Sequence, residues 1–192
     1  IYISKWKQRI NEEMRAEIKD DYYRMTGEKY SISAKTLATL LFSHQIRYMR
    51  LWRKANKKMT IFRRLRLWYY SRKYGLEISP TANIGKGLYL GHPYNITVGI
   101  GVKIGNNVNL HKACTIGREN RGKREGAPTI GNCVSIGINS TIVGKITIGS
   151  DVMIAPNSFV NFDVPDHSVV IGNPGIIHEK ENATQGYVAF LV

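Results

Sequence analysis

From residue 78 onward, aliphatic residues recur at every sixth position, and Gly, Asn or Asp fill many of the positions between them. A small or apolar residue follows most of them four positions later. The hexads open with Ile78, Ile84, Leu90, Val98, Ile104, Leu110, Ile130, Ile136, Ile142, Ile148, Ile154 and Val160. The second set comprises Ala82, Leu88, Val102, Val108, Cys114, Val134, Ser140, Ile146, Val152, Ser158 and Val164. This repeat predicts a parallel β-helix, in which each hexad is a short strand plus a turn and each coil buries its inward residues against its neighbours.

Two interruptions break the six-residue rhythm. Two extra residues follow the hexad that contains His92, within "GLYLGHPYNITVG". A longer interruption contains "GRENRGKREGAP", which starts at Gly117. The first predicts an enlarged turn beside His92, and the second predicts a long loop.

Residues 4 to about 74 instead repeat with helical spacing. A first helix is expected to close near Gly27, a second to run from Ser33 through Lys58, and a third to end at Gly75. In the second, an apolar stripe comprises Leu37, Leu40, Leu41, His44, Tyr48 and Leu51, and a basic stripe comprises Arg47, Arg50, Lys54 and Lys58. The pattern therefore predicts a helical subdomain over 1–75, a β-helix over 76–177 and a C-terminal tail over 178–192.

The net charge of +14 is concentrated in the helical part. No acidic residue occurs from Lys29 to Leu76. An ordinary solvated basic face explains this, and so does a peripheral contact with an anionic membrane or a lipid-linked substrate. Nucleic acid is not an expected partner, because no known binding motif accompanies the charge.

The lack of a recognisable targeting signal and the small number of cysteines both favour the cytoplasm. The chain has no apolar run long enough to span a bilayer, and its first residues carry charges where a secretory signal needs an apolar stretch. The two cysteines, Cys114 and Cys133, form no disulfide framework and have no metal-ligand spacing. We therefore expect a cytoplasmic protein without a metal ion. Peripheral association with a membrane is the alternative location.

The hexads resemble the left-handed parallel β-helix of hexapeptide acyltransferases. The stretches "LEISPTANIGKGLYLGHPYNITVG", "IGNNVNLHKACTIG", "PTIGNCVSIGINSTIVGKITIG" and "DVPDHSVVIGNPGIIH" are similar to the serine acetyltransferase branch and its relatives in capsular and exopolysaccharide gene clusters. The resemblance covers residues 76–177. It implies acetyl-CoA as the acyl donor, a homotrimer or a dimer of trimers, and active sites between neighbouring β-helices.

The resemblance makes His92 the general base. The family has an acidic residue fifteen positions before this histidine, and Glu77 occupies that position here, where Asp is commoner in the family. A neutral imidazole can accept the proton of an attacking hydroxyl, and a carboxylate can orient the imidazole. The alternative is a turn histidine without chemistry. His167 and His44 are expected to be structural.

Further site residues follow from the hexad position or from the resemblance. His111 should point outward near the coil of His92, either as an acceptor-binding residue or as an incidental histidine. The implied acceptor contacts also include Asn95 and Arg118. For acetyl-CoA, the resemblance implies backbone contacts at Gly137, Ile138 and Ala155, with Pro156 toward the adenine. Cysteine chemistry is not expected, so direct transfer is favoured over an acyl-enzyme.

One departure from the family bears on the acceptor. Serine acetyltransferases have an Arg-His-Pro element that holds the amino-acid acceptor, and the matching residues here are Gly126, Ala127 and Pro128. The preceding loop carries four basic residues between Arg118 and Arg124. We therefore expect a sugar hydroxyl of a capsular, exopolysaccharide or O-antigen precursor as the first candidate acceptor. Serine, as in cysteine biosynthesis, is the alternative, and a non-catalytic β-helix scaffold is a second one.

Overall fold

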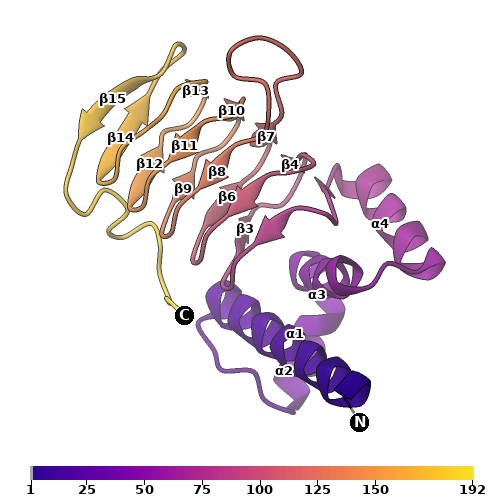
Figure 1. Ribbon diagram of the computed structural model, residues 1–192. Helices are drawn as coiled ribbons and strands as arrows, with labels where there is room; N and C mark the ends of the chain where they lie inside the picture. The colour runs from indigo at the N-terminus through magenta and orange to yellow at the C-terminus, as the bar shows by residue number, and fades with distance from the viewer. Residues whose placement is uncertain (1) are drawn as a thin grey trace.

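The computed structural model describes residues 2–192, with side chains from residue 11 onward. Four helices precede fifteen short strands (Figure 1). The helices are α1 (Tyr2–Thr26), α2 (Ala34–Phe42), α3 (His44–Lys57) and α4 (Ile61–Tyr74). The strands are β1 (Glu77–Ile78), β2 (Asn83–Ile84), β3 (Tyr89–Gly91), β4 (Thr97–Val98), β5 (Lys103–Ile104), β6 (Asn109–His111), β7 (Thr115–Gly117), β8 (Thr129–Ile130), β9 (Ser135–Ile136), β10 (Thr141–Val143), β11 (Thr147–Ile148), β12 (Val152–Ile154), β13 (Phe159–Val160), β14 (Ser168–Ile171) and β15 (Ile176–Glu179).

The strands form three parallel sheets that wind as one solenoid. Strands separated by three along the chain are neighbours, in the orders β1-β4-β7-β10-β13, β2-β5-β8-β11 and β3-β6-β9-β12. Each of these coils therefore contributes one strand to each sheet. In the last coil β14 follows β12 in the third sheet, because the second sheet has only an isolated bridge there, between Ile148 and Val164. Only β15 is antiparallel, where it pairs with β14 at the far end. The predicted fold class is confirmed: a mainly β, left-handed parallel β-helix of about five turns follows a region of four helices.

The core of the β-helix consists of the residues that the six-residue repeat singles out. Every hexad-opening residue from Ile78 to Val160 is buried, and so is every residue of the second set from Ala82 to Val164. Burying one Val, Leu or Ile side chain contributes about 1.5–3 kcal/mol to folding. The repeat therefore predicted both the coil register and the inward face.

The predicted second helix, by contrast, is two helices. Ser43 has φ −84° and ψ 108°, and its N–H donates to the Thr39 carbonyl, so it ends α2 and begins α3. The Ser43 hydroxyl is buried and forms no hydrogen bond, so the extended backbone at Ser43, and not side-chain capping, separates the two helices. The predicted apolar stripe is consequently divided: Leu37 and Leu41 are exposed, whereas Tyr48 and Leu51 are buried. The expected helix ends at Gly27 and Gly75 are confirmed, and Gly75 closes α4 with φ 65°.

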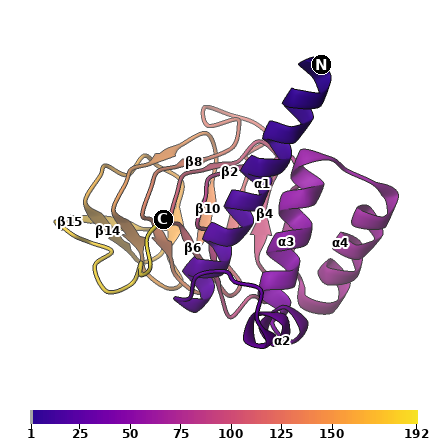
Figure 2. The same ribbon diagram turned by 90° about the horizontal axis from the view of Figure 1, so that it is seen from below.

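Helices α1 and α3 cover the open end of the first coil (Figure 2). The buried Arg53 donates to both Asp21 carboxylate oxygens, at 2.8 and 2.9 Å, and to the Ile84 carbonyl at 2.7 Å. Asp21 in turn accepts a hydrogen bond from the Leu88 N–H at 3.0 Å. These contacts satisfy backbone groups that the first coil of a solenoid otherwise leaves unpaired at its open end.

The C-terminal segment returns across the third sheet toward α1. Asp151 accepts hydrogen bonds from the N–H and hydroxyl of Thr184, at 2.9 and 2.7 Å. Asn109 donates to the Tyr187 carbonyl at 2.8 Å, and Asn107 donates to the Val192 carbonyl at 3.0 Å. The boundary predicted at residue 177 falls inside β15. These hydrogen bonds therefore attach the tail to two coils of the β-helix.

Candidate active site

Successive coils turn from the third sheet into the first sheet at one edge of the solenoid, which we call the His92 edge. Its turns follow β3, β6, β9 and β12 and contain His92–Asn95, Lys112–Ala113, Ile138–Asn139 and Pro156–Asn157. Backbone hydrogen bonds connect them: the Ala113 N–H donates to Tyr94, Asn139 to Lys112 and Asn157 to Ile138, at 2.9, 3.0 and 2.9 Å. Each turn has a residue in the left-handed region, with φ of 56° to 61° at Asn95, Ala113, Asn139 and Asn157. The edge is thus a continuous ladder of similar turns.

This ladder brings together predicted site residues that are far apart in the sequence. His92 lies on its first coil, Gly137 and Ile138 on its third, and Ala155 and Pro156 on its fourth. Because neighbouring strands are about 4.8 Å apart, roughly 15 Å separates the first coil from the fourth. The predicted base and the predicted cofactor contacts therefore line one edge of one chain.

Some backbone groups at the predicted acetyl-CoA contacts already form hydrogen bonds within the chain. The Ala155 N–H donates to Val170 at 2.8 Å, its carbonyl accepts from the Ser140 hydroxyl at 2.8 Å, and the Ile138 carbonyl accepts from Asn157. A Cβ on Gly137 would lie 2.6 Å from the Pro156 nitrogen, so only glycine allows this stacking. Ile138 is 45% exposed, an apolar side chain presented to solvent at the edge.

His92 is exposed and has φ 49°, just beyond the end of β3. Gly91 pairs with His111 on the next coil, and a Cβ on Gly91 would lie only 2.4 Å from His111 Nδ1. Burial, together with the nearby His92, lowers the pKa of His111, which keeps its imidazole neutral at pH 7. The structure thus places the two histidines on adjacent coils, with glycine making room for the second ring.

Glu77 lies at the α-helical end of the His92 edge. Its N–H donates to the carbonyl of Ile96, which follows the His92 turn, at 2.9 Å. Its carboxylate accepts a hydrogen bond from the Ser71 hydroxyl of α4 at 2.6 Å. Within the described residues, no hydrogen bond joins Glu77 to His92. The predicted pair shares an edge, and its direct contact stays a prediction.

The turn that holds His92 is supported by aromatic rings that sequence reasoning did not connect to the site. The Asn95 N–H donates to the Tyr74 carbonyl at 2.9 Å, which ties the end of α4 to this turn. The His44 ring stacks on Tyr74 at 4.4 Å and contacts Tyr94 at 5.3 Å between centroids. Burial lowers the pKa of His44. His44 therefore packs, as predicted, and it does so against the His92 turn.

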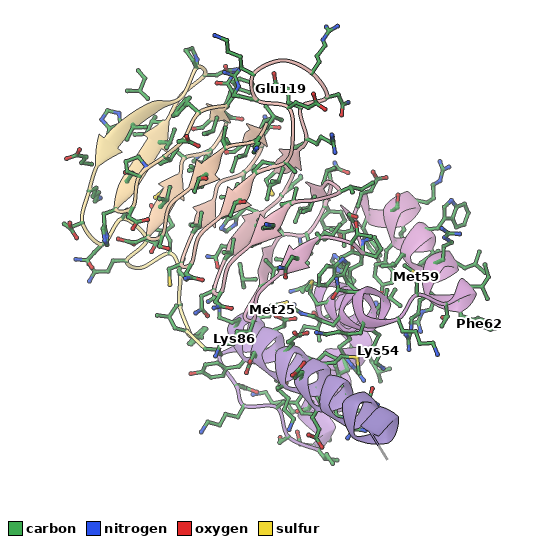
Figure 3. All side chains as sticks on the ribbon, viewed as in Figure 1. Met25, Lys54, Met59, Phe62, Lys86 and Glu119 are labelled. Carbon is green, nitrogen blue, oxygen red and sulfur yellow. The ribbon has the colours of Figure 1, made fainter. Side chains whose placement is uncertain are left out.

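Arg118 is not brought to His92 within one chain. β7 starts at the His92 edge and ends at Gly117, so Arg118 lies at the opposite end of that strand. The loop that follows projects from the solenoid, with Glu119 near its base (Figure 3). Arg118 and Glu125 form an ion pair at 3.8 Å, and Arg124 and Glu119 form one at 3.4 Å. The two predicted site elements therefore occupy different edges.

A groove of about 790 Å³ lies between α4 and the first strands of the first sheet. Trp68, Met59 and Ile100 provide apolar parts of its wall, and Ser71 and Glu77 provide polar parts. His92 is not among the residues that line it. The groove therefore meets the His92 edge only through Glu77.

The thiols of both cysteines have raised pKa values. Burial raises the pKa of the Cys114 thiol to about 12, and burial also raises the pKa of Cys133. A protonated thiol is a poor nucleophile. Among the described residues, no group of three or more His, Cys, Asp or Glu side chains could hold a metal ion. No helix in the described part of the chain has the length and apolarity needed to cross a membrane.

Comparison with known proteins agrees with the repeat and the fold. Residues 127–161 match the family described as "Bacterial transferase hexapeptide (six repeats)". The chain is 36% identical over 125 residues to "Serine acetyltransferase 2" of Arabidopsis thaliana, which covers 65% of this chain and 38% of that protein. It resembles the structure "Soybean Serine Acetyltransferase Complexed with Serine" with TM-score 0.73 and 25% identity, over 86% of this chain and 69% of that one.

A third relative resembles this chain in fold alone. "Serine acetyltransferase in complex with Coenzyme A" from Brucella abortus gives TM-score 0.71 at 24% identity, over 88% of this chain and 67% of that one. The fold and the repeats define the chain as a hexapeptide-repeat, left-handed β-helix protein. The chain spans about two fifths of the length of the first curated relatives that it matches, each covered over 38%.

Proposed function

We propose that this protein is an O-acetyltransferase that transfers the acetyl group of acetyl-CoA to a hydroxyl. The observation that carries the proposal is the His92 edge, where an exposed histidine and the predicted cofactor contacts share one ladder of turns. The serine acetyltransferase relatives support this reading. Acetyl-CoA is a cytoplasmic metabolite, so the proposed place of action is the cytoplasm.

The proposed reaction is direct transfer in a ternary complex. His92 accepts the proton of the acceptor hydroxyl while that oxygen attacks the thioester carbonyl. A backbone N–H at the edge stabilises the resulting oxyanion. The C–S bond then breaks, and the coenzyme A sulfur leaves with the proton that His92 held. Glu77 would orient the imidazole after exchanging its Ser71 hydrogen bond for one to His92, and the neutral His111 would contact the acceptor.

The comparisons favour serine as the acceptor over the sugar that the sequence placed first, because the matched relatives carry the name serine acetyltransferase. One observation keeps a sugar hydroxyl as the second candidate. Gly126 and Ala127 stand where that family has the arginine and histidine that hold the amino acid, and neither has a polar side chain. The position faces Lys145 instead, within 3.0 Å of where a Gly126 Cβ would lie.

The placement of Arg118 supports a homotrimer as part of the proposal. In one chain the loop after β7 and the His92 edge lie on different edges of the solenoid. Packing β-helices side by side would bring the loop of one copy against the His92 edge of the next. Arg118 and Asn95 would then both border the acceptor.

The acceptor is tested by incubating the full chain with acetyl-CoA and either L-serine or nucleotide sugars, with products identified by mass spectrometry. We expect O-acetylserine at a rate that saturates with serine. If acetylated sugar forms and O-acetylserine does not, the acceptor is the sugar hydroxyl and not serine. Failure to bind acetyl-CoA at millimolar concentration would favour a non-catalytic scaffold.

A further inference from the structure

A cavity of about 270 Å³ lies between α3 and α4. Its wall comprises Arg47, Arg66, Tyr69, Tyr70, Lys73 and Tyr74. Five of these six residues come from α4, where spacings of three and four place side chains on one helix face. Figure 2 shows α3 and α4 packed alongside each other. The cavity is thus built from one helix face and one arginine of the neighbouring helix.

The three cations of this cavity have no acidic counterpart. None of Arg47, Arg66 and Lys73 forms an ion pair with a carboxylate of the described residues. The sequence has no Asp or Glu between Glu28 and Glu77 to provide one. The pKa of nearby Lys54 is lowered, by burial and by the charges of Arg50, Arg63 and Arg66. Positive charge therefore accumulates here at a cost to folding.

The inner wall has an unsatisfied donor. The Nε of Arg47 is buried and has no hydrogen-bond partner, although another nitrogen of the same guanidinium donates to the Leu41 carbonyl. Tyr70, which is 5% exposed, forms part of the wall beside it. A buried donor without a partner costs roughly 1–3 kcal/mol. The Arg47 guanidinium is thus only partly satisfied within the chain, and it belongs to a wall that carries two further cations.

The aromatic rings restrict what kind of anion fits. Tyr69 packs edge-on against Tyr70 at 6.0 Å between centroids, and Lys73 Nζ lies 5.5 Å from the Tyr69 ring and 5.3 Å from the Tyr74 ring. Arginines recognise the several oxygens of a phosphoryl group, lysine adds a point charge, and exposed rings pack against a small polar body. A phosphoryl group has both the negative charge that these cations attract and the several acceptor oxygens that their N–H groups can bind.

We propose that the cavity between α3 and α4 is a binding site for a phosphoryl group, carried by a small polar molecule or a lipid headgroup. The site borders the His92 turn through Tyr74 but does not include His92, and it does not depend on acetyl transfer. Arg66 and Lys73 at the rim and Arg47 at the inner wall bind the phosphoryl oxygens, and the tyrosines pack against the group that carries it.

The test titrates the full chain with pyrophosphate by calorimetry at constant ionic strength in a phosphate-free buffer. Arg66→Gln and Lys73→Gln should each weaken binding about tenfold or more, since each removes a charge-assisted contact. Both side chains are on the surface, so the variants should unfold at the temperature of the parent chain. Arg72→Gln is the matched control, because it removes one charge from the same helix at a residue that packs over Trp68 instead. It should change affinity less than about twofold.

Two outcomes overturn the site: no saturable binding of pyrophosphate, or equal weakening by Arg66→Gln and Arg72→Gln. Acetyl-CoA affinity of the Arg66 and Lys73 variants should equal that of the parent chain, and parallel loss of both ligands would overturn the separate site and assign these residues to acetyl-CoA binding. The source of the phosphoryl group is distinguished with vesicles of phosphatidylcholine with and without phosphatidylglycerol. Retention on the anionic vesicles that Lys73→Gln reduces and Arg72→Gln does not supports a headgroup. Pyrophosphate binding without retention supports a soluble ligand.

Discussion

The helical region and the β-helix of this chain use apolar residues in opposite ways. In the β-helix, every hexad-opening residue from Ile78 to Val160 is buried. In the helical region, Leu37, Leu41, Phe62 and Trp68 are each more than half exposed. Figure 3 shows Phe62 at the outer side of α4. Within the solenoid the repeat supplies the core, which α3 and α4 extend at the first coil, whereas α2 and α4 also leave apolar side chains exposed in the single chain.

This difference also separates the proposed chemistry from the proposed recognition. The His92 edge depends on the regular stacking of turns, because its residues come from different coils. The cavity between α3 and α4 depends on spacing along α4 and on the packing of α3 beside it. The rigid region thus positions the groups for catalysis, and the helical region presents charge to ligands.

The largest expected effect concerns the edge. His92→Ala should lower kcat for acetyl transfer about 10²–10⁴-fold, because it removes the general base. The measurement is steady-state release of coenzyme A with the identified acceptor. His167→Ala is the control, since His167 pairs with Asp151 at 2.9 Å on another part of the surface, and it should keep kcat within about twofold. Wild-type turnover by His92→Ala would remove the histidine from the mechanism.

The next largest effect is expected on stability, at the contact between the helices and the first coil of the β-helix. Asp21→Asn breaks the buried pair with Arg53 and should lower the free energy of unfolding by about 3–5 kcal/mol, because a buried guanidinium loses its counter-charge. Chemical denaturation followed by circular dichroism measures it. Glu28→Gln breaks the exposed pair with Lys35 and should cost less than about 1 kcal/mol. Equal costs would show that the junction is not a stabilising contact.

A pair of leucine truncations tests the comparison directly. Leu110→Ala empties a fully buried position of the β-helix and should cost about 2–5 kcal/mol of unfolding free energy. Leu41→Ala truncates a side chain that is 56% exposed on α2 and should cost less than about 0.5 kcal/mol. Thermal unfolding of both variants measures the difference. A cost above 1 kcal/mol for Leu41→Ala would indicate that another copy of the chain covers this surface.

The smallest expected effect concerns the tail. Burial would raise the pKa of Asp151, but hydrogen bonds from Thr184, His167 and Ala183 lower it to about 2. Because this pKa lies below the ordinary value of 3.8, the carboxylate stabilises the fold fully above about pH 4, and that stability is lost as the pH falls through about 2. Asp151→Asn should therefore loosen the tail at neutral pH by roughly 1 kcal/mol.

Hydrogen exchange of the Ala183 and Thr184 amides measures this release. Asp163→Asn is the control, since Asp163 accepts a hydrogen bond from the Thr147 N–H and does not contact the tail. Faster exchange at Ala183 and Thr184 in Asp151→Asn alone is the expected result. Unchanged exchange would show that Asn109 and Asn107 hold the tail without Asp151.

Much of the fold could be predicted from the sequence, because a solenoid repeats one short structural unit and each unit is specified by its own residues. Ile136 and Val134, for example, face inward because each coil has the same period as its neighbours, and no distant residue is needed to decide their direction. The candidate site was predictable only in part. The sequence predicted that Glu77 orients His92, but the hydrogen bond that Glu77 forms is to Ser71, and it depends on where α4 packs.

The break between α2 and α3 shows the same limit. The spacing from Leu37 to Leu51 continues across Ser43 as in one helix, and nothing local distinguishes the exposed half from the buried half. Tyr48 and Trp52 are buried because α3 packs on the first coil, where Trp52 donates to the Ser79 carbonyl at 3.2 Å. That packing is a contact between residues 27 positions apart.

The sequence by itself therefore determined the β-helix, its inward face and the enlarged turn at His92, since these follow from a six-residue period that each coil repeats. Only the tertiary structure decided that Arg118 lies on the opposite edge from His92, that Arg53 is buried against Asp21, and that cations of α3 and α4 surround one cavity. Those features depend on how elements distant in the chain meet, and backbone and side-chain partners outside the repeat determine that packing.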